Sequence, residues 1–256
     1  MKPKFSIITV CFNSAKTIRE TIESVLSQDY PDIEYIVIDG GSIDETLAIV
    51  NEYADRISAV ISEQDNGIYD AMNKGIILSS GDIVGMLNSD DIYFNNASVS
   101  TLINKMQVTG SDSVFSDLLV VDKNNPDKVV RYYDSSQFSP IKFKYGLMPA
   151  HPTFFMKKYF YNLYGLYSTE YKIAADYELL MRMLWTHKIS HAYHKGPTVK
   201  MRSGGISTNG LKNSLILNKE IIKACRENNI YTNIIFLLTK LPKKIEELMI
   251  SRNIKK

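Results

Sequence analysis

The chain has 256 residues, which is enough for one large domain or for one and a half. Hydrophobic residues make up 45% and charged residues 23%, and this mixture excludes a disordered chain, a collagen and a disulfide scaffold. The net charge of +2 is unevenly divided, because residues 211–256 carry 10 Lys and Arg against 4 Asp and Glu, while the remainder is acidic. An acidic body is a poor partner for nucleic acid, so we expect no nucleic-acid ligand.

The two cysteines and the N-terminus predict a cytoplasmic protein. Cys11 and Cys225 lie far apart and form no CxxC pair, which favours a reducing compartment and argues against a zinc site. The apolar stretch near the N-terminus is too short and too mixed for a signal peptide. No run of about 18 apolar residues is present, so no transmembrane helix is predicted.

The first part of the chain alternates between strand and helix patterns. Runs rich in β-branched residues predict strands, and apolar residues recurring with helical spacing predict the helices between them. The strands are expected at 5–12, 33–39, 57–62 and 82–87, and the helices at 14–28, 42–53 and 69–79. Ser42 and Glu45 have the spacing of a capping box for the second helix. This alternation predicts an α/β fold with a mostly parallel sheet and right-handed crossovers.

Polar side chains follow the ends of all four predicted strands. Ligands of open parallel sheets bind beyond the carboxyl ends of the strands, so these side chains should converge on one rim. They are Asn13, Asp39, Glu63, Asp65, Asn88, Asp90 and Asp91.

The pattern loosens after Asp91. Residues 113–121 and 128–133 are expected to pair as a hairpin, and 138–165 is read as an aromatic-rich mixture of loop and strand. Helices are expected at 174–185 and 211–227, followed by a last short helix interrupted near Pro242.

The sequence Asn88-Ser89-Asp90-Asp91 directly follows an apolar strand and is the strongest local signal. Two adjacent carboxylates at a strand end call for a compensating cation, and oxygen ligands suit Mg²⁺ or Mn²⁺. The alternative is a turn or helix N-cap cluster. Because no GxxxxGK[ST] or GxGxxG motif is present, phosphate would be held by a cation and side chains, which suits a diphosphate-linked donor.

Five segments in this order resemble glycosyltransferase family 2 enzymes with the GT-A fold. The segments are SIITVCFN, SQDYPDIEYIVIDGGSIDET, NGIYDAMNKGI, GDIVGMLNSDD and AADYELLMR. The resemblance covers roughly residues 5–207 and implies transfer of a sugar from a nucleotide diphosphate donor to an acceptor hydroxyl, with inversion and with Mg²⁺ or Mn²⁺. It divides the chain into a catalytic domain at 1–210, with a nucleotide-sugar half at 1–92 and an acceptor half at 93–210, and a basic helical extension at 211–256.

The resemblance also implies roles for single residues. Asp176 matches the catalytic base, Asp91 the metal ligand on the diphosphate, and Asp90 the ligand of the ribose or sugar. The residues implied in donor binding are Phe12 and Asn13 in the nucleotide pocket, Asp39 near the base, and Asp65 and Lys74 near the nucleotide and diphosphate.

Two positions depart from the family pattern. Many members have a second Asp where this chain has Gly40, and that acid often contacts the base, so the nucleotide is less constrained here. Asn88 stands where many members carry Asp, but Asp90 and Asp91 remain, so a metal is still expected.

Several positions have a structural alternative. Asp176 alone would be read as a helix cap, and the aromatic residues of 159–177 as core rather than as a sugar platform. His151 is either a contact to the acceptor or donor lid, or a hydrogen-bonded loop histidine. Arg202-Ser203-Gly204-Gly205-Ile206-Ser207 resembles a mobile loop that closes over the donor, with Arg202 on the diphosphate, or is a plain glycine-rich connector.

The basic and apolar tail from Leu211 onward has two interpretations. It docks on an anionic membrane surface at the inner face of the plasma membrane, where a lipid-linked glycan acceptor is found, or it packs on the catalytic domain or in a homodimer. The packing alternative is slightly preferred.

The resemblance therefore implies an inverting, metal-dependent glycosyltransferase that extends a bacterial polysaccharide or lipopolysaccharide, with a UDP-sugar as the preferred donor. GDP- and dTDP-sugars are alternatives. A nucleotidyltransferase is a weak rival, because it would normally show a glycine-rich and basic loop at residues 11–15. A non-catalytic nucleotide-sugar-binding protein of the same fold is the other rival.

Overall fold

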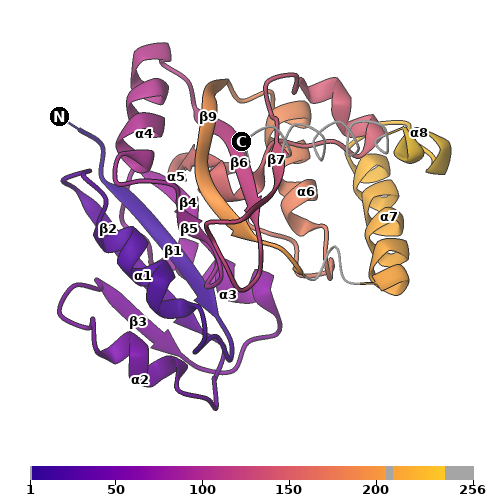
Figure 1. Ribbon diagram of the computed structural model, residues 1–256. Helices are drawn as coiled ribbons and strands as arrows, with labels where there is room; N and C mark the ends of the chain where they lie inside the picture. Colours follow the sequence, from indigo (N-terminus) through magenta and orange to yellow (C-terminus); the bar gives the residue numbers. More distant parts are fainter. Residues whose placement is uncertain (1, 206–209, 240–256) are drawn as a thin grey trace.

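The computed structural model describes residues 2–205 and 210–239. Within them a nine-stranded sheet, in the order β3-β2-β1-β4-β8-β6-β9-β5 with β7 beside β6, is flanked by helices on both faces (Figure 1). The predicted α/β class is confirmed. The sheet is mixed rather than wholly parallel, because β5, β7 and β8 run antiparallel to their neighbours.

The first four strands of the model form the predicted parallel unit. They are β1 (Phe5–Cys11), β2 (Ile33–Asp39), β3 (Ala59–Ser62) and β4 (Ile83–Met86), connected by α1 (Ile18–Leu26), α2 (Thr46–Asn51) and α3 (Ile68–Leu78). Cys11 pairs with Asp39, and Asp39 pairs with Ser62. This register brings the carboxyl ends of the strands to one edge, at the bottom of Figure 1, as expected.

The capping box predicted at Ser42 is wrong. Helix α2 begins at Thr46, four residues later, and its N-cap is Glu45. The Ser42 hydroxyl donates instead to Asp39 Oδ1 at 2.5 Å, and Asp44 Oδ1 accepts from the Thr46 N–H at 3.0 Å. Ser42 therefore belongs to the loop that follows β2, because the buried Asp39 carboxylate competes for its hydroxyl.

The second half extends the sheet on the other side of β4. The predicted hairpin is confirmed as β6 (Ser113–Val121) and β7 (Val129–Tyr133). Strand β8 (Phe155–Lys157) lies between β4 and β6, and β9 (His191–Arg202) runs parallel to β6 and pairs with β5 (Ile92–Tyr93). The remaining elements are α4 (Ser98–Thr109), η1 (Pro140–Tyr145), η2 (His151–Thr153), α5 (Lys158–Tyr164), α6 (Ala175–Met181) and the π-helical turn η3 (Arg182–Thr186).

Alternate side chains of β1 enter two apolar clusters on opposite faces of the sheet. Ile8 and Val10 pack with residues of α3, α6 and the C-terminal helix α7 (Gly210–Glu227), whereas Phe5 and Ile7 pack with residues of α1 and α4. This is the period of two expected for a strand covered on both faces. Each cluster contains residues from both predicted halves of the catalytic domain.

The C-terminal helix α7 (Gly210–Glu227) packs against α6. Its residues Ile221, Ala224 and Cys225 are buried in the same cluster as Tyr177 of α6. Helix α8 (Ile234–Leu238) follows, and the interruption predicted near Pro242 lies outside the described residues. Among the residues that the structure describes, no helix is both long and apolar enough to cross a membrane.

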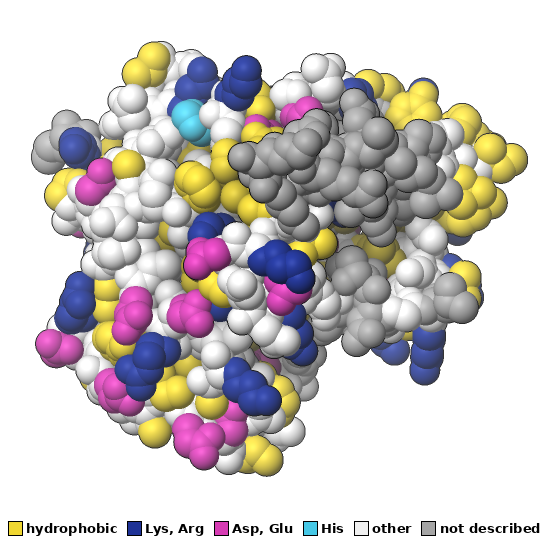
Figure 2. Space-filling view, in the orientation of Figure 1, with side chains coloured by type: hydrophobic (Ala, Val, Ile, Leu, Met, Phe, Trp, Pro, Cys, Tyr) yellow, Lys and Arg dark blue, Asp and Glu magenta, His cyan; other side chains and the backbone are white. Residues whose placement is uncertain are grey.

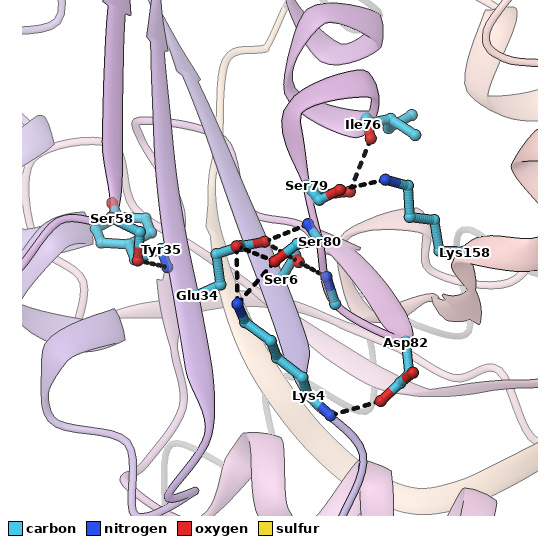
Figure 3. A network of polar contacts seen from close by, with 11 residues as sticks. Lys4, Ser6, Glu34, Tyr35, Ser58, Ile76, Ser79, Ser80, Asp82 and Lys158 are labelled. Carbon is cyan, nitrogen blue, oxygen red and sulfur yellow. Dashed lines mark hydrogen bonds and ion pairs between the residues drawn. The ribbon is translucent and has the colours of Figure 1, made fainter.

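A polar network closes the opposite edge of the sheet, where β1 and β2 begin (Figure 3). Glu34 accepts hydrogen bonds from Lys4 Nζ at 3.0 Å, the Ser6 hydroxyl at 2.6 Å and the Ser80 N–H at 2.6 Å. Burial acts to raise the pKa of Glu34, but these bonds outweigh it and lower the pKa to about 2. This edge is held together by internal hydrogen bonds and by the Lys4–Glu34 ion pair.

Candidate active site

The loop after β1 forms one wall of the predicted rim. Phe12 is 62% exposed, and Asn13 has a φ of 49°, a left-handed conformation that asparagine tolerates better than most residues. The Asn13 N–H donates to the Ser42 hydroxyl at 2.8 Å, and Asn13 Oδ1 accepts from the Ile43 N–H at 3.0 Å. The loops after β1 and β2 are therefore fixed to each other, with the Phe12 ring left open to a ligand.

Asp39 is fully buried and its carboxylate is occupied. Oδ2 accepts from the Gly41 and Ser42 N–H groups and from the Ser62 hydroxyl at 2.7 Å, and Oδ1 accepts from the Ser42 hydroxyl. Burial acts to raise the pKa of Asp39, but these bonds lower it overall. In this conformation Asp39 has no exposed oxygen for a nucleotide base. The predicted place near the base therefore becomes an indirect role, in which Asp39 shapes the loop around Gly40.

Asp65 and Lys74 are brought together next to Gly40. Lys74 Nζ lies 2.5 Å from Asp65 Oδ1 and 2.8 Å from Glu63 Oε1. A Cβ atom on Gly40 would lie 3.0 Å from Asp65 Oδ2 and 3.6 Å from the Phe12 ring. An acid at position 40, as many family members have, would face the Asp65 carboxylate. Because Gly40 has no side chain, the Asp65–Lys74 pair borders the space beside the Phe12 ring.

The Asn88–Asp91 turn lies against the loop after β1. The hydroxyls of Ser14 and Ser89 are 2.8 Å apart, and the Asp91 N–H donates to the Asn88 carbonyl at 3.0 Å. Asp90 is half-buried, whereas Asp91 is only 1% exposed. Of the two acids, Asp90 is the more accessible to a ligand at the surface, although the sequence analysis assigned the metal to Asp91.

The pKa values of both acids are raised above their ordinary value. Burial is the main cause for Asp90 and for Asp91, and the charge of Asp90 adds to the effect on Asp91, while Arg202 acts in the opposite direction on both. Both carboxylate oxygens of Asp91 and Oδ1 of Asn88 are buried without a hydrogen-bond partner. Buried oxygens of this kind need a proton or a cation.

The oxygen donors of the turn fit a hard divalent cation. Within the described residues, no cluster of three or more His, Cys, Asp or Glu side chains could hold a metal. The protein would therefore supply one or two carboxylates, Asp90 and Asp91, and phosphate oxygens and water would complete the shell. Mg²⁺ is commonly bound in this way.

Arg202 stabilises the Asn88–Asp91 turn. It is the last residue of β9 and is 5% exposed, so it belongs to the strand and not to a loop over the donor. Its guanidinium donates to the Asp90 carbonyl at 2.8 Å and to Glu20 Oε2 at 2.6 Å. With one bond each from Nη1 and Nη2 to the protein and only 5% of the residue exposed, Arg202 holds the turn in this conformation. Residues 206 and 207 of the predicted closing loop lie outside the described residues.

Asp176 lies near the start of α6 on a segment that is anchored from two directions. The Glu220 carboxylate of α7 accepts from the N–H groups of Lys172, Ile173 and Ala174 at 2.8–2.9 Å. The Tyr69 hydroxyl of α3 donates to the Ile173 carbonyl at 2.6 Å. Glu220 was missed by the sequence analysis, because a long-range contact to backbone groups leaves no local pattern.

His151 is placed directly beside Asp176. Its Nδ1 lies 3.2 Å from Asp176 Oδ2, and the two side chains are 32% and 17% exposed. The other carboxylate oxygen, Oδ1, accepts from the Tyr177 N–H at 2.8 Å. The structure thus joins two predicted site residues that are 25 positions apart, on η2 and α6, in a partly exposed pair.

The aromatic residues of 159–177 are mostly core in this structure. Tyr161, Tyr171 and Tyr177 are buried, and Tyr167 stacks on Tyr69 with ring centroids 5.8 Å apart. Tyr159 is the exposed exception, at the start of α5. This favours the structural alternative over a sugar platform for most of the segment.

Comparison with known proteins identifies the family of the chain. The model of the family "Glycosyl transferase family 2" matches residues 6–164, more than half of the chain. A PGL/p-HBAD biosynthesis glycosyltransferase of Mycobacterium bovis is 26% identical, covering 98% of this chain and 96% of its own length. An uncharacterized glycosyltransferase of Mycobacterium tuberculosis is 33% identical, covering 70% of this chain and 68% of its own.

Solved structures show the same fold. S. aureus TarS 1–349 in complex with UDP-GlcNAc has a TM-score of 0.69 at 19% identity, covering 89% of this chain and 68% of that one. The mannosyltransferase PcManGT from Pyrobaculum calidifontis, in complex with GDP-Man and Mn²⁺, has a TM-score of 0.62 at 18% identity, covering 89% and 64%. The fold is that of GT-A glycosyltransferases. The chain belongs to glycosyltransferase family 2, and it is a glycosyltransferase.

Proposed function

We propose that this enzyme transfers a sugar from a nucleotide diphosphate donor, most simply a UDP-sugar, to an acceptor hydroxyl with inversion. The observation that carries the proposal is the meeting of four strand-end loops at one edge, with the Asp90–Asp91 turn and the open Phe12 ring in the same rim. The TarS complexes contain UDP and UDP-GlcNAc, and PcManGT contains GDP-Man, which supports a nucleotide-sugar donor here.

The proposed displacement reaction needs one general base, Asp176. Asp176 takes the proton of the acceptor hydroxyl as that oxygen forms a bond to the anomeric carbon of the donor. The bond from that carbon to the diphosphate oxygen breaks on the opposite side, and its electron pair leaves with the nucleoside diphosphate. One displacement inverts the anomeric configuration and needs no covalent enzyme intermediate. A bound divalent cation would supply charge neutralisation for the leaving diphosphate.

In this proposal Phe12, Asn13, Asp65 and Lys74 bind the nucleotide part of the donor, and Asp90 and Asp91 hold Mn²⁺ or Mg²⁺ and the diphosphate. The unpartnered oxygens of Asp91 favour a cation at the turn, and the partial exposure of Asp90 makes it the carboxylate nearer to the donor. The Mn²⁺ in the PcManGT structure supports a divalent ion in this fold.

Calorimetric titration of UDP, GDP and dTDP, with and without Mn²⁺, tests the donor site. We expect one nucleotide to bind only with the cation, and Asp90→Asn and Asp91→Asn to weaken that binding. Asp112→Asn, which changes an acid of the opposite edge, is the matched control. A folded wild-type protein that binds none of the three nucleotides would refute the donor site.

The acceptor proposed is a glycan or a lipid-linked glycan in bacterial surface polysaccharide or lipopolysaccharide biosynthesis. The relative in M. bovis is named a PGL/p-HBAD biosynthesis glycosyltransferase, which supports a biosynthetic role for this enzyme. A screen of lipid-linked and soluble glycan acceptors with the donor found by calorimetry tests this part separately. Transfer to soluble small-molecule acceptors alone would argue against it.

We further propose that α8 contacts an anionic membrane surface. Tyr231, Ile234, Ile235 and Leu238, here called the α8 patch, are each about half exposed or more, and Figure 2 shows hydrophobic side chains gathered at this end. The sequence that follows, residues 240–256, is strongly basic. Co-sedimentation with anionic but not neutral vesicles, lost in Ile235→Glu, is expected. A dimer that Ile235→Glu dissociates, without vesicle binding, would assign the patch to a homodimer instead.

A further inference from the structure

The His151–Asp176 pair is the only contact in the described site that joins a second titratable side chain to the proposed base. Nδ1 of the imidazole lies 3.2 Å from Oδ2 of the carboxylate, which is longer than the roughly 2.7–2.9 Å of a charge-assisted hydrogen bond. Catalytic contacts in a free enzyme are often longer than in the substrate complex. The family resemblance assigns the base but gives no group that orients it.

The backbone segments that carry His151 and Asp176 are each held by hydrogen bonds to other elements. Next to His151, the buried Thr153 donates to the Ser116 carbonyl at 3.1 Å and accepts from the Ser116 N–H at 3.0 Å, which fixes η2 on β6. The Ala150 N–H donates to the Ser135 hydroxyl at 3.3 Å. Asp176 is held through Glu220 and Tyr69, as described above. The backbone that carries each side chain is therefore held by elements that come from different parts of the sequence.

The pair is also open to a ligand. Both partners keep part of their side-chain surface exposed, 32% for His151 and 17% for Asp176, so a ligand can reach the pair. Oδ1 of Asp176 is occupied by the Tyr177 N–H, and Oδ2 faces His151, so the orientation of the carboxylate is set at both oxygens. An acceptor hydroxyl can then approach only along the remaining lone-pair directions.

We propose that His151 is a positioning residue, whose Nδ1–H orients the Asp176 carboxylate for removal of the acceptor proton. The inference rests on the proposed function, because it requires Asp176 to be the base. In this inference His151 orients the base, Asp176, and does not bind the acceptor or the donor. The imidazole makes no bond to the sugar, and the proton of the acceptor goes to Asp176.

Kinetics of donor hydrolysis, with water as acceptor, test the proposal without an identified glycan. The substrate is whichever of UDP-glucose, UDP-GlcNAc and GDP-mannose the wild type hydrolyses. We expect His151→Ala to lower kcat by about a hundredfold with little change in the donor KM, because a misplaced base slows the chemical step. His151→Asn keeps an N–H donor near the position of Nδ1 and should recover most of the loss. His194→Ala, a histidine of β9, is the control.

Nitrogen NMR of ¹⁵N-labelled histidine gives a second readout that does not depend on turnover. In the wild type the His151 ring should carry its proton on Nδ1, and Asp176→Ala should shift it to the Nε2–H form. The His151 signal is identified by its loss in His151→Asn.

Three results would overturn the inference. Unchanged kcat in His151→Ala shows that the contact is incidental. A raised KM with unchanged kcat assigns His151 to binding. If His151→Ala loses kcat as completely as Asp176→Asn does, and His151→Asn recovers none of it, His151 itself is the base. If the wild type neither binds a nucleotide nor hydrolyses any donor, the proposed function fails, and the NMR result still shows whether the pair forms.

Discussion

Arg202 at the end of β9 donates to the backbone carbonyl of Asp90, 112 positions earlier in the chain, at 2.8 Å. The same guanidinium binds Glu20 of α1 at 2.6 Å. One buried side chain therefore joins a strand of the second half, a helix of the first half and the acidic turn. Its position indicates that the shape of the proposed cation site depends on residues remote from it in sequence.

Replacing Arg202 should weaken cation-dependent nucleotide binding. Arg202→Met leaves the Asp90 carbonyl without this donor, so the turn loses a support, and we expect a stability loss of about 1–3 kcal/mol. Calorimetry with the nucleotide and Mn²⁺, next to urea unfolding, measures both effects. Glu20→Gln is the control, because it keeps the Arg202–Asp90 contact. If Arg202→Met lowers stability but binds nucleotide as the wild type does, Arg202 only supports the fold.

Glu220 should be required for full activity although it lies on the C-terminal helix. Glu220→Ala removes the acceptor of three consecutive N–H groups ahead of the helix that carries Asp176. We expect kcat to fall by about tenfold or more, because small displacements of a base are costly, while nucleotide affinity stays unchanged. The neighbouring Lys219→Ala is the matched control. Normal kcat in Glu220→Ala would show that this support is dispensable.

Glu34 should make stability sensitive to acid. Its pKa falls from the usual 4.5 to about 2 in the folded protein, so its stabilising effect is fully present above pH 4.5 and is lost as the pH falls from about 4.5 to about 2. Glu34→Gln should be less stable than the wild type by about 1–3 kcal/mol at neutral pH. Urea unfolding at several pH values measures the difference between the two proteins. The expected difference shrinks in acid, and a difference that is independent of pH would contradict this role.

Gly75 should tolerate no side chain. A Cβ atom there would lie 2.3 Å from Cγ2 of Ile8, because α3 packs closely on β1. Overpacking of this kind costs about 1–3 kcal/mol, which exceeds the gain of about 1 kcal/mol in helix propensity for Gly75→Ala. Thermal or urea unfolding measures it, with Gly205→Ala as control, since a Cβ there meets no atom of the described residues within 4 Å. Equal or higher stability of Gly75→Ala would mean that α3 can move away from the sheet.

The sequence predicted the parallel half of the fold well, since each strand and helix there has a complete local pattern. The hairpin of β6 and β7 was also found, because two β-rich runs flank a turn. Strands β5 and β8 were missed, because two or three residues carry no periodicity. Strand β9 was missed since half of its residues are polar and its pairing with β6 is set by distant residues.

The candidate site residues follow from motifs in the sequence, whereas their geometry depends on the tertiary fold. Asp90, Asp91 and Asp176 follow motifs, but the burial of Asp91 and Asp39 depends on packing that no local pattern records. Arg202 was expected in a loop because glycines follow it, whereas its buried bonds keep it in the strand. The pairing of His151 with Asp176 joins η2 to α6 through the tertiary fold alone.

The central claim is a single displacement at the anomeric carbon with Asp176 as the base. Proton NMR of the glycoside formed from an α-linked nucleotide sugar reports the configuration of that carbon directly. We predict a β-linked product from the wild type, and no product from Asp176→Asn under conditions where that variant binds the nucleotide normally. An α-linked product, or transfer by Asp176→Asn at the wild-type rate, would contradict the account.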